Sequence, residues 1–285
     1  MKKYIIVCVV SVMVSICISS VKADLIYGTF ATSAYTFDAN SQPLDKTRSV
    51  YWAGGIVGKN VTTMQDLQFF CGDPYTNTTR DFIELDKGQE YNTAPLAVAP
   101  GLSFDQKKSI QSLFNHVYSP LLSAQATLAL ITENSEEKSL AQNSVDILGA
   151  AFQFAIWEIL YETSDTWDIT SGSFTITNPN PNPAVDDRDF FLTPSDAYME
   201  IVGLTNGWFT SIKTGIWADN FAGETFYRVT YFFIDETSDV TSQPFFAATG
   251  KGNTEITGIV PAPASILILG LGLGGLPFFR RKKQN

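Results

Sequence analysis

Ala150-Ala-Phe-Gln-Phe-Ala-Ile-Trp-Glu-Ile-Leu160 is apolar at nearly every position. A helix that is apolar all round is buried on most of its faces, so this stretch predicts the central helix of the fold. The helix is expected to begin near Ser135-Glu136-Glu137, because acidic residues suit the positive end of a helix, and to continue through Ile159. Gln153 lies in the middle of the apolar stretch, and Trp157 follows one turn later on the same side.

Further helices and strands are expected on both sides of this helix. Ser103-Phe-Asp-Gln106 has the form of a capping box and predicts an earlier helix. Apolar residues continue that helix at helical spacing: Ile110, Leu113, Phe114, Val117 and Leu121. Thr193-Pro194-Ser195-Asp196 predicts the start of a third helix, with Thr as the cap and Pro in the first turn.

Strands are predicted before and after this helical part. They cover residues 24 to about 70, a short segment at 171–177, and 226–235, where apolar and polar residues alternate. An extended loop is predicted at 178–183, which reads Asn-Pro-Asn-Pro-Asn-Pro. N-terminal strands, a central cluster of about three helices and C-terminal antiparallel strands indicate an α+β fold rather than alternating βαβ units.

The composition excludes several classes of function. The chain has 285 residues, a net charge of −10 and a pI near 4.6. Nucleic acid is therefore not expected as a partner, because phosphate binding needs clustered Lys and Arg. His116 is the only histidine, which excludes a multi-histidine metal site, and we expect neither a metal nor another cofactor.

The N-terminus resembles a secretory signal and the C-terminus a membrane segment. Residues 1–23 combine a basic start, an apolar stretch and Val21-Lys22-Ala23, so cleavage is expected before Asp24. At the other end, an apolar run at 264–279 is shorter than the roughly 20 residues of a comfortable spanning helix. The basic residues after it would stay cytoplasmic under the positive-inside rule, which leaves the body outside.

Three features of the C-terminus together resemble the PEP-CTERM sorting signal of Gram-negative bacteria. They are Val260-Pro261-Ala262-Pro263, the glycine-rich apolar run, and a basic cluster that begins with Arg280 and Arg281. Ala262 stands where the family usually has glutamate. The resemblance implies that an exosortase-like membrane peptidase removes the segment and passes the body toward the cell surface, often alongside exopolysaccharide. A plain C-terminal anchor is the alternative.

These segments define three parts: a signal peptide at 1–23, one exported domain at 24–259, and a sorting segment at 260–285. The expected location is the periplasm, outer surface or extracellular matrix of a Gram-negative bacterium, with membrane contact only through the terminal segments. The terminal segments hold seven of the 19 basic residues and no acid. The body therefore carries 12 basic and 29 acidic residues, a net charge of −17, which keeps it away from anionic surfaces.

Cys71 is the only cysteine of the exported body, because Cys8 and Cys17 leave with the signal. It is expected where a strand runs into a turn, before Gly72-Asp73-Pro74. Four explanations are open: an inert buried thiol, an intermolecular disulfide, a nucleophile working with His116, and a different internal cross-link. Gln153 has a structural explanation of its own, a hydrogen bond to the backbone of a neighbouring strand.

Two short segments resemble the thioester domain of bacterial surface adhesins. They are Phe70-Cys71-Gly72-Asp73 and Phe152-Gln153-Phe154-Ala155-Ile156-Trp157, within a similarity that spans roughly residues 45–235. Gly72 replaces the hydrophobic residue usual after the cysteine. The resemblance implies that the Cys71 thiol and the Gln153 carboxamide condense to an internal thioester, which attaches covalently to an amine of a target. The protein would then be an adhesin and not an enzyme.

Other residues and functions complete the set of hypotheses. His116 and Glu158 are candidates to assist the thiol by residue type alone, and Trp157 is a candidate to keep the site dry. The main alternative is a non-reactive surface protein of an exopolysaccharide or biofilm matrix that binds without covalent chemistry. A hydrolase built on Cys71 and His116 is a second alternative. Trp208 and Trp217 suit either a core or a ligand platform.

Overall fold

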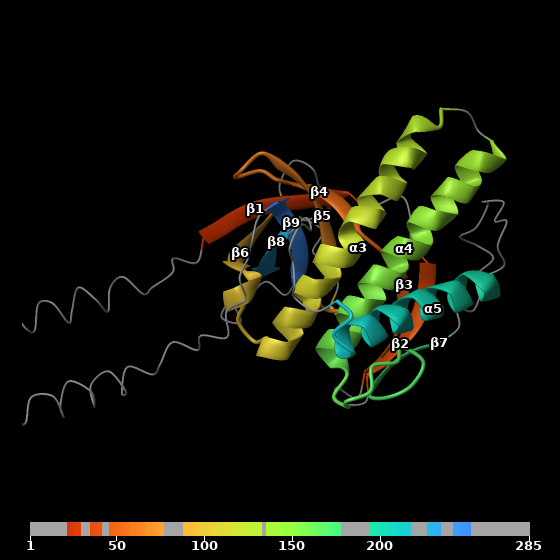
Figure 1. Ribbon diagram of the computed structural model, residues 1–285. Coiled ribbons are helices and arrows are strands. Elements are labelled where there is room, and N and C mark those ends of the chain that lie inside the picture. The colour runs from red at the N-terminus through yellow and green to blue at the C-terminus, as the bar shows by residue number, and fades with distance from the viewer. Residues whose placement is uncertain are drawn as a thin grey trace, which may run out of the picture. The chain divides into compact units, whose positions relative to one another are not determined.

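The computed structural model describes residues 22–29, 35–41, 46–76, 88–132, 135–177, 194–217, 227–234 and 242–251 (Figure 1). All of these residues belong to one unit that ends at Thr254. The signal sequence up to residue 21, the loop at 178–183 and the sorting segment at 260–285 lie outside the described residues, and what was expected of them stays a prediction.

Six strands close into an antiparallel barrel in the order β1-β4-β5-β9-β8-β6. Each strand pairs with two neighbours, so the described sheet has no open edge along its paired length. The bounds are β1 Lys22–Thr29, β4 Ile56–Asn60, β5 Gln65–Cys71, β6 Gln89–Pro95, β8 Tyr227–Phe233 and β9 Phe245–Lys251.

A second sheet and three helices stand beside the barrel in Figure 1. The sheet has the order β3-β2-β7, with bounds β3 Lys46–Ala53, β2 Tyr35–Ser41 and β7 Phe174–Thr177. The helices are α3 Phe104–Leu130, α4 Glu136–Tyr161 and α5 Pro194–Lys213, and a 3-10 turn covers Leu96–Val98. Helix α4 packs against α3, α5 and all three strands of the second sheet, while α3 also packs on β8.

The starts of the two long helices follow the sequence pattern. The N–H of Ser103 donates to Gln106 Oε1 at 2.9 Å and the N–H of Gln106 to Ser103 Oγ at 3.2 Å, so the predicted capping box is confirmed. Gln106 Nε2 also donates to the carbonyls of Ile159 and Leu160, which ties the start of α3 to the end of α4. Ser135 caps α4 through the N–H of Lys138.

Helix α4 is the core helix that its composition predicts. Every residue from Gly149 to Ile159 is buried. Among the described residues it is also the one helix long and apolar enough to cross a membrane, but most of its apolar stretch is buried inside the protein. Burial within the fold is therefore sufficient to explain its apolar character.

The α+β architecture is confirmed, with N-terminal strands, a central group of helices and C-terminal antiparallel strands. Two features go beyond the sequence pattern. The pattern did not predict the closed barrel or strand β6, in which Tyr91 and Ala94 alone are buried. The strand expected at 171–177 is shorter, because residues 168–171 form a turn held by a single β-bridge between Asp168 and Ser171.

Candidate functional site

Strand β5 ends at Cys71, and its partner on one side ends earlier. The β4–β5 ladder pairs Ile56 with Phe69, and the chain before Ile56 leaves the sheet at Gly54 and Gly55. Continuing this register by two residues would place Gly54 opposite Cys71. On its other side Cys71 pairs with Phe245 of β9. The last residue of β5 therefore lacks a backbone neighbour on the β4 side.

Gln153 from the middle of α4 occupies this missing position. The N–H of Cys71 donates to Gln153 Oε1 at 2.8 Å, and Gln153 Nε2 donates to the carbonyl of Cys71 at 2.7 Å. Gln153 is 0% exposed and Cys71 is 7% exposed. The carboxamide thus replaces a peptide group in the ladder, and it does so at the residue that carries the thiol.

Glycines lie on both sides of the place where α4 meets the chain before β4. A Cβ atom added to Gly149, one turn before Gln153, would lie 3.8 Å from the Cα of Gly54 and 3.9 Å from the N of Gly55. A Cβ atom added to Gly55 would overlap the side chain of Gln68. Helix α4 therefore passes close to the two glycines before β4, and the backbone of Gly55 is tightly covered by Gln68.

Aromatic rings surround the Cys71–Gln153 contact. The rings of Phe70 and Phe152, the residues directly before the cysteine and the glutamine, lie with centroids 4.4 Å apart. Phe114 of α3 packs edge-on against both, at 5.9 and 5.0 Å. All three phenylalanines are fully buried. Three fully buried rings therefore enclose this side of the contact.

The segment after Cys71 forms the border of the site toward solvent. The N–H of Gly72 donates to the carbonyl of Pro244 at 2.7 Å, and the Tyr161 hydroxyl lies 3.4 Å from the carbonyl of Gly72. Tyr75 packs edge-on against the ring of Tyr161. Burial, and next the nearby Asp73 carboxylate, raise the pKa of Tyr161, so this phenol stays protonated.

The three candidate assisting residues lie at different places. Trp157 is one turn from Gln153 on the same side of α4, is 1% exposed, and its indole N–H has no hydrogen-bond partner among the described residues. Glu158 is five positions from Gln153, about 140° around the helix. Its Oε1 accepts a hydrogen bond from the N–H of Asp168 at 2.8 Å, in the loop that follows α4.

His116 faces another part of the fold. It is two positions from Phe114, about 200° around α3, and its ring stacks on Trp217 at 4.6 Å with an interplanar angle of 14°. The structure thus brings together Cys71, Gln153 and the Trp157 side of α4, and directs Glu158 and His116 elsewhere.

Several residues of the site carried no signal in the sequence. Gly149, Tyr161 and Pro244 lie outside the two short segments, and strand pairing or helix packing brings them to Cys71. Within the described ranges, no group of three His, Cys, Asp or Glu side chains is arranged to hold a metal ion. Comparison of the chain with protein-family models, curated proteins and solved structures gives no match.

Proposed function

We propose that this chain is an exported cell-surface protein whose body forms an internal thioester between Cys71 and Gln153 and attaches covalently to an amine on a target. The observation that carries the proposal is the pair of hydrogen bonds, 2.8 and 2.7 Å long, between the Gln153 carboxamide and the backbone of Cys71. The oxygen and the nitrogen of the carboxamide both contact the residue that bears the thiol. The two residues whose side chains would react are therefore already in contact across the helix–strand boundary.

Forming the bond is a simple exchange. The Cys71 sulfur adds to the Gln153 carboxamide carbon, a C–S bond forms, and the C–N bond breaks. The nitrogen leaves as ammonia with the thiol proton. A thioester is a better acylating agent than an amide and is lost to water when wetted, which is why the enclosure by buried phenylalanines supports the proposal.

In the attachment step the Cys71 sulfur is the leaving group instead of the nucleophile. A primary amine of the target adds to the thioester carbonyl, an amide bond to Gln153 forms, and the Cys71 thiol is released with a proton. The reaction occurs once per molecule, so the protein is a single-use cross-linker and not a turnover enzyme. Because Trp157 lies next to Gln153 on α4, we propose that its unpartnered indole N–H donates to the carbonyl oxygen during these steps.

The alternatives predict different behaviour. A buried glutamine that pairs with a strand backbone also fits a purely structural role, which suits the non-covalent matrix protein. A Cys71–His116 hydrolase would need imidazole beside the thiol, whereas His116 stacks on Trp217. This arrangement makes the hydrolase the weakest of the three proposals.

The decisive experiment is the intact mass of freshly purified protein. Thioester formation lowers the mass by about 17 Da, the mass of ammonia, and incubation with methylamine then adds one methylamine per chain. Cys71→Ala and Gln153→Ala are each expected to abolish both changes. Gln111→Ala is the matched control, because Gln111 is also a buried helical glutamine that donates to a strand carbonyl, that of Tyr227.

Each outcome decides between the proposals. A mass deficit and amine labelling in the wild type and in Gln111→Ala, but in neither site variant, support the thioester. Full unmodified mass in fresh wild-type protein refutes it and leaves the structural role for Gln153. Repeated turnover of a thioester or peptide substrate would favour the hydrolase instead.

The proposed export makes a separate prediction about the N-terminus. Strand β1 is described from Lys22, so cleavage before Asp24 removes its first two residues. Ladder pairs from Asp24 with Tyr91 to Thr29 with Val57 remain, and these keep the strand in the barrel. We expect the mature protein to begin at Asp24 and to lose its C-terminal segment near Pro263. Mass spectrometry of cell-surface fractions tests both ends.

A further inference from the structure

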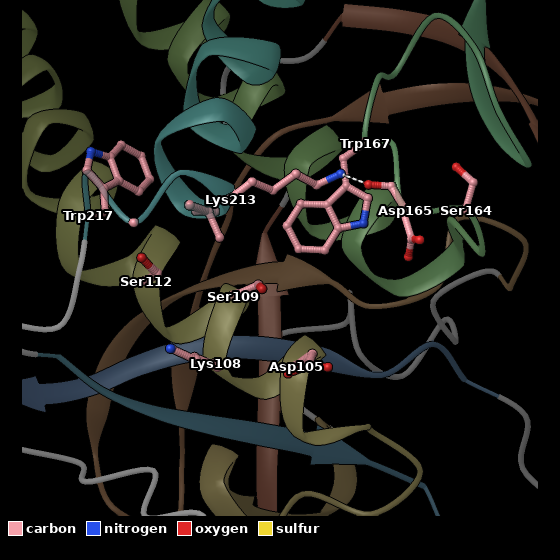
Figure 2. A pocket seen from close by; sticks show the side chains of 11 residues that line it. Asp105, Lys108, Ser109, Ser112, Ser164, Asp165, Trp167, Lys213 and Trp217 are labelled. Atoms are coloured by element: carbon pink, nitrogen blue, oxygen red, sulfur yellow. Dashed lines mark hydrogen bonds between the residues drawn. The ribbon is translucent and has the colours of Figure 1, made fainter.

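A second site lies apart from the Cys71–Gln153 contact. A cavity of about 400 Å³ is formed by the first turns of α3, the loop after α4 and the end of α5, and none of its lining residues contributes to the thioester site (Figure 2). Its size falls in the range typical of small-ligand sites. Two tryptophans, Trp167 and Trp217, line it, and Figure 2 shows them on either side of the Lys213 side chain.

Trp217 is positioned by the way α5 ends. Gly215 has a φ of 70°, a left-handed conformation that favours glycine and turns the chain back over α3. The N–H of Trp217 donates to the carbonyl of Ser211 at 3.2 Å, which fixes this turn. His116 stacks on one face of the Trp217 indole, and the ring also lines the cavity.

Trp167 lies in the loop after α4, whose backbone N–H groups donate hydrogen bonds to two glutamate side chains. The Glu162 carboxylate accepts from the N–H groups of Ser164 and Ser173, each at 2.6 Å, and Glu158 accepts from Asp168. The ring of Trp167 packs edge-on against Phe209 of α5 at 5.5 Å. The loop is thus fixed before any ligand arrives, which lowers the entropy cost of binding.

The polar groups of the cavity are numerous and balanced in charge. Lys213 Nζ lies 4.7 Å from the centre of the Trp167 ring and donates to the carbonyl of Asp165. Asp105 and Asp165 contribute two acids, and Lys213 and Lys108 two bases. Serine hydroxyls, among them that of Ser109, supply donors and acceptors. Neither a cationic nor an anionic ligand is favoured by this lining.

We propose that this cavity binds a neutral saccharide without covalent attachment. The indole of Trp217 suits the C–H face of a pyranose, while the hydroxyl and carboxylate groups of the lining, and the Lys213 ammonium that Trp167 holds, suit its hydroxyls. The balanced lining and the net charge of −17 on the body select against uronic-acid or sulfated sugars. The site gives the protein a reversible contact with a carbohydrate surface that does not depend on the thioester.

A glycan array tests the proposal, with neutral hexose and N-acetylhexosamine oligosaccharides beside uronic-acid and sulfated ones. The protein carries Cys71→Ala, so that no thioester reacts with amines on the array and the result is independent of the proposed covalent chemistry. Titration of bound glycans by tryptophan fluorescence then gives affinities. We expect neutral glycans to bind, and Trp167→Ala or Trp217→Ala to weaken binding at least about tenfold.

The controls separate recognition from folding. Trp208→Ala removes a half-buried tryptophan of α5 that does not line the cavity, and it should bind as the parent does. Lys213→Met keeps the aliphatic stem beside Trp167 but removes the ammonium, and should weaken binding several-fold without unfolding. Absence of neutral glycan binding, a preference for acidic glycans, or unchanged affinity in both folded Trp variants would overturn the proposal.

Discussion

Replacing Glu158 with glutamine should reveal a buried acid that the fold keeps protonated. The side chain is 0% exposed, and its Oε2 has no hydrogen-bond partner within the described part of the chain. Burial raises the pKa of Glu158 from 4.5 to about 8. The carboxylates of Glu162 and Asp168 add to this, whereas the hydrogen bond from the Asp168 N–H and the charge of Lys213 oppose it.

The sign and size of the effect follow from proton linkage. Between pH 4.5 and 8 the unfolded chain has released the Glu158 proton and the folded chain has kept it, so rising pH favours unfolding. At about 1.4 kcal/mol per pH unit, the wild type loses on the order of 3–5 kcal/mol across this window. Below about pH 4.5 and above about pH 8 the contribution of this group is constant.

Glu158→Gln has nearly the same shape, still accepts from the Asp168 N–H, and does not titrate. The free energy of unfolding of Glu158→Gln should therefore be close to that of the wild type at pH 5 and exceed it by a few kcal/mol at pH 8.5. Urea unfolding at four pH values measures this, in a Cys71→Ala background so that no thioester opens at high pH. A stability difference that is the same at every pH would refute the reasoning, because it would mean that Glu158 titrates alike in both states.

Three further predictions concern the Cys71–Gln153 contact, the packing of α4 and the loop after α4. If the proposed thioester forms, Cys71→Ala and Gln153→Ala both remove a cross-link that closes a loop of 82 residues, worth about 4–5 kcal/mol in the chain-entropy model. Gln153→Ala should be less stable still, by about 2–3 kcal/mol in urea unfolding, because it also leaves the buried N–H and carbonyl of Cys71 without their hydrogen-bond partner. Gly149→Ala places a methyl at ordinary contact distance, 3.8 Å from the Cα of Gly54, and should raise the melting temperature slightly because alanine has the higher helix propensity. Gly149→Leu should separate the helix from the strand and reduce amine labelling. Burial alone would raise the pKa of Glu162, but the backbone N–H groups that bond to it lower that pKa overall. Glu162→Gln should therefore reduce the free energy of unfolding at neutral pH, and this loss should shrink as the pH falls through the carboxyl range. The pH dependence is opposite in sign to that of Glu158→Gln.

Local patterns predicted the helices well because their causes are local. The capping box at Ser103 and the wholly apolar stretch of α4 both depend on residues within a few turns. The barrel could not be predicted in this way. Strand β5 pairs with β9, in which Phe245 is the partner of Cys71, and no periodicity in either segment specifies the other. Strand partners are set by contacts distant in the sequence.

The cavity between α3 and α5 illustrates the same limit. The sequence left Trp217 undecided between core and ligand platform, and Trp167 carried no signal. The left-handed turn at Gly215 and the ordered loop at 162–173 bring the two rings to one cavity. Residue type indicates that an aromatic ring has two possible uses, and only its neighbours in space decide between them.

The fold uses side-chain amides more than once to complete a strand, and this bears on how Gln153 is interpreted. On α3, Gln111 donates to the carbonyl of Tyr227 at 2.8 Å, and Asn115 accepts from the N–H of the same residue at 3.2 Å. That pairing has the same form as the one between Gln153 and Cys71, yet it involves no thiol. A buried amide beside a strand end therefore has a sufficient structural reason in this protein. What singles out Gln153 is the identity of its partner, so substitutions at Cys71 discriminate between structure and chemistry, whereas the burial of the glutamine does not.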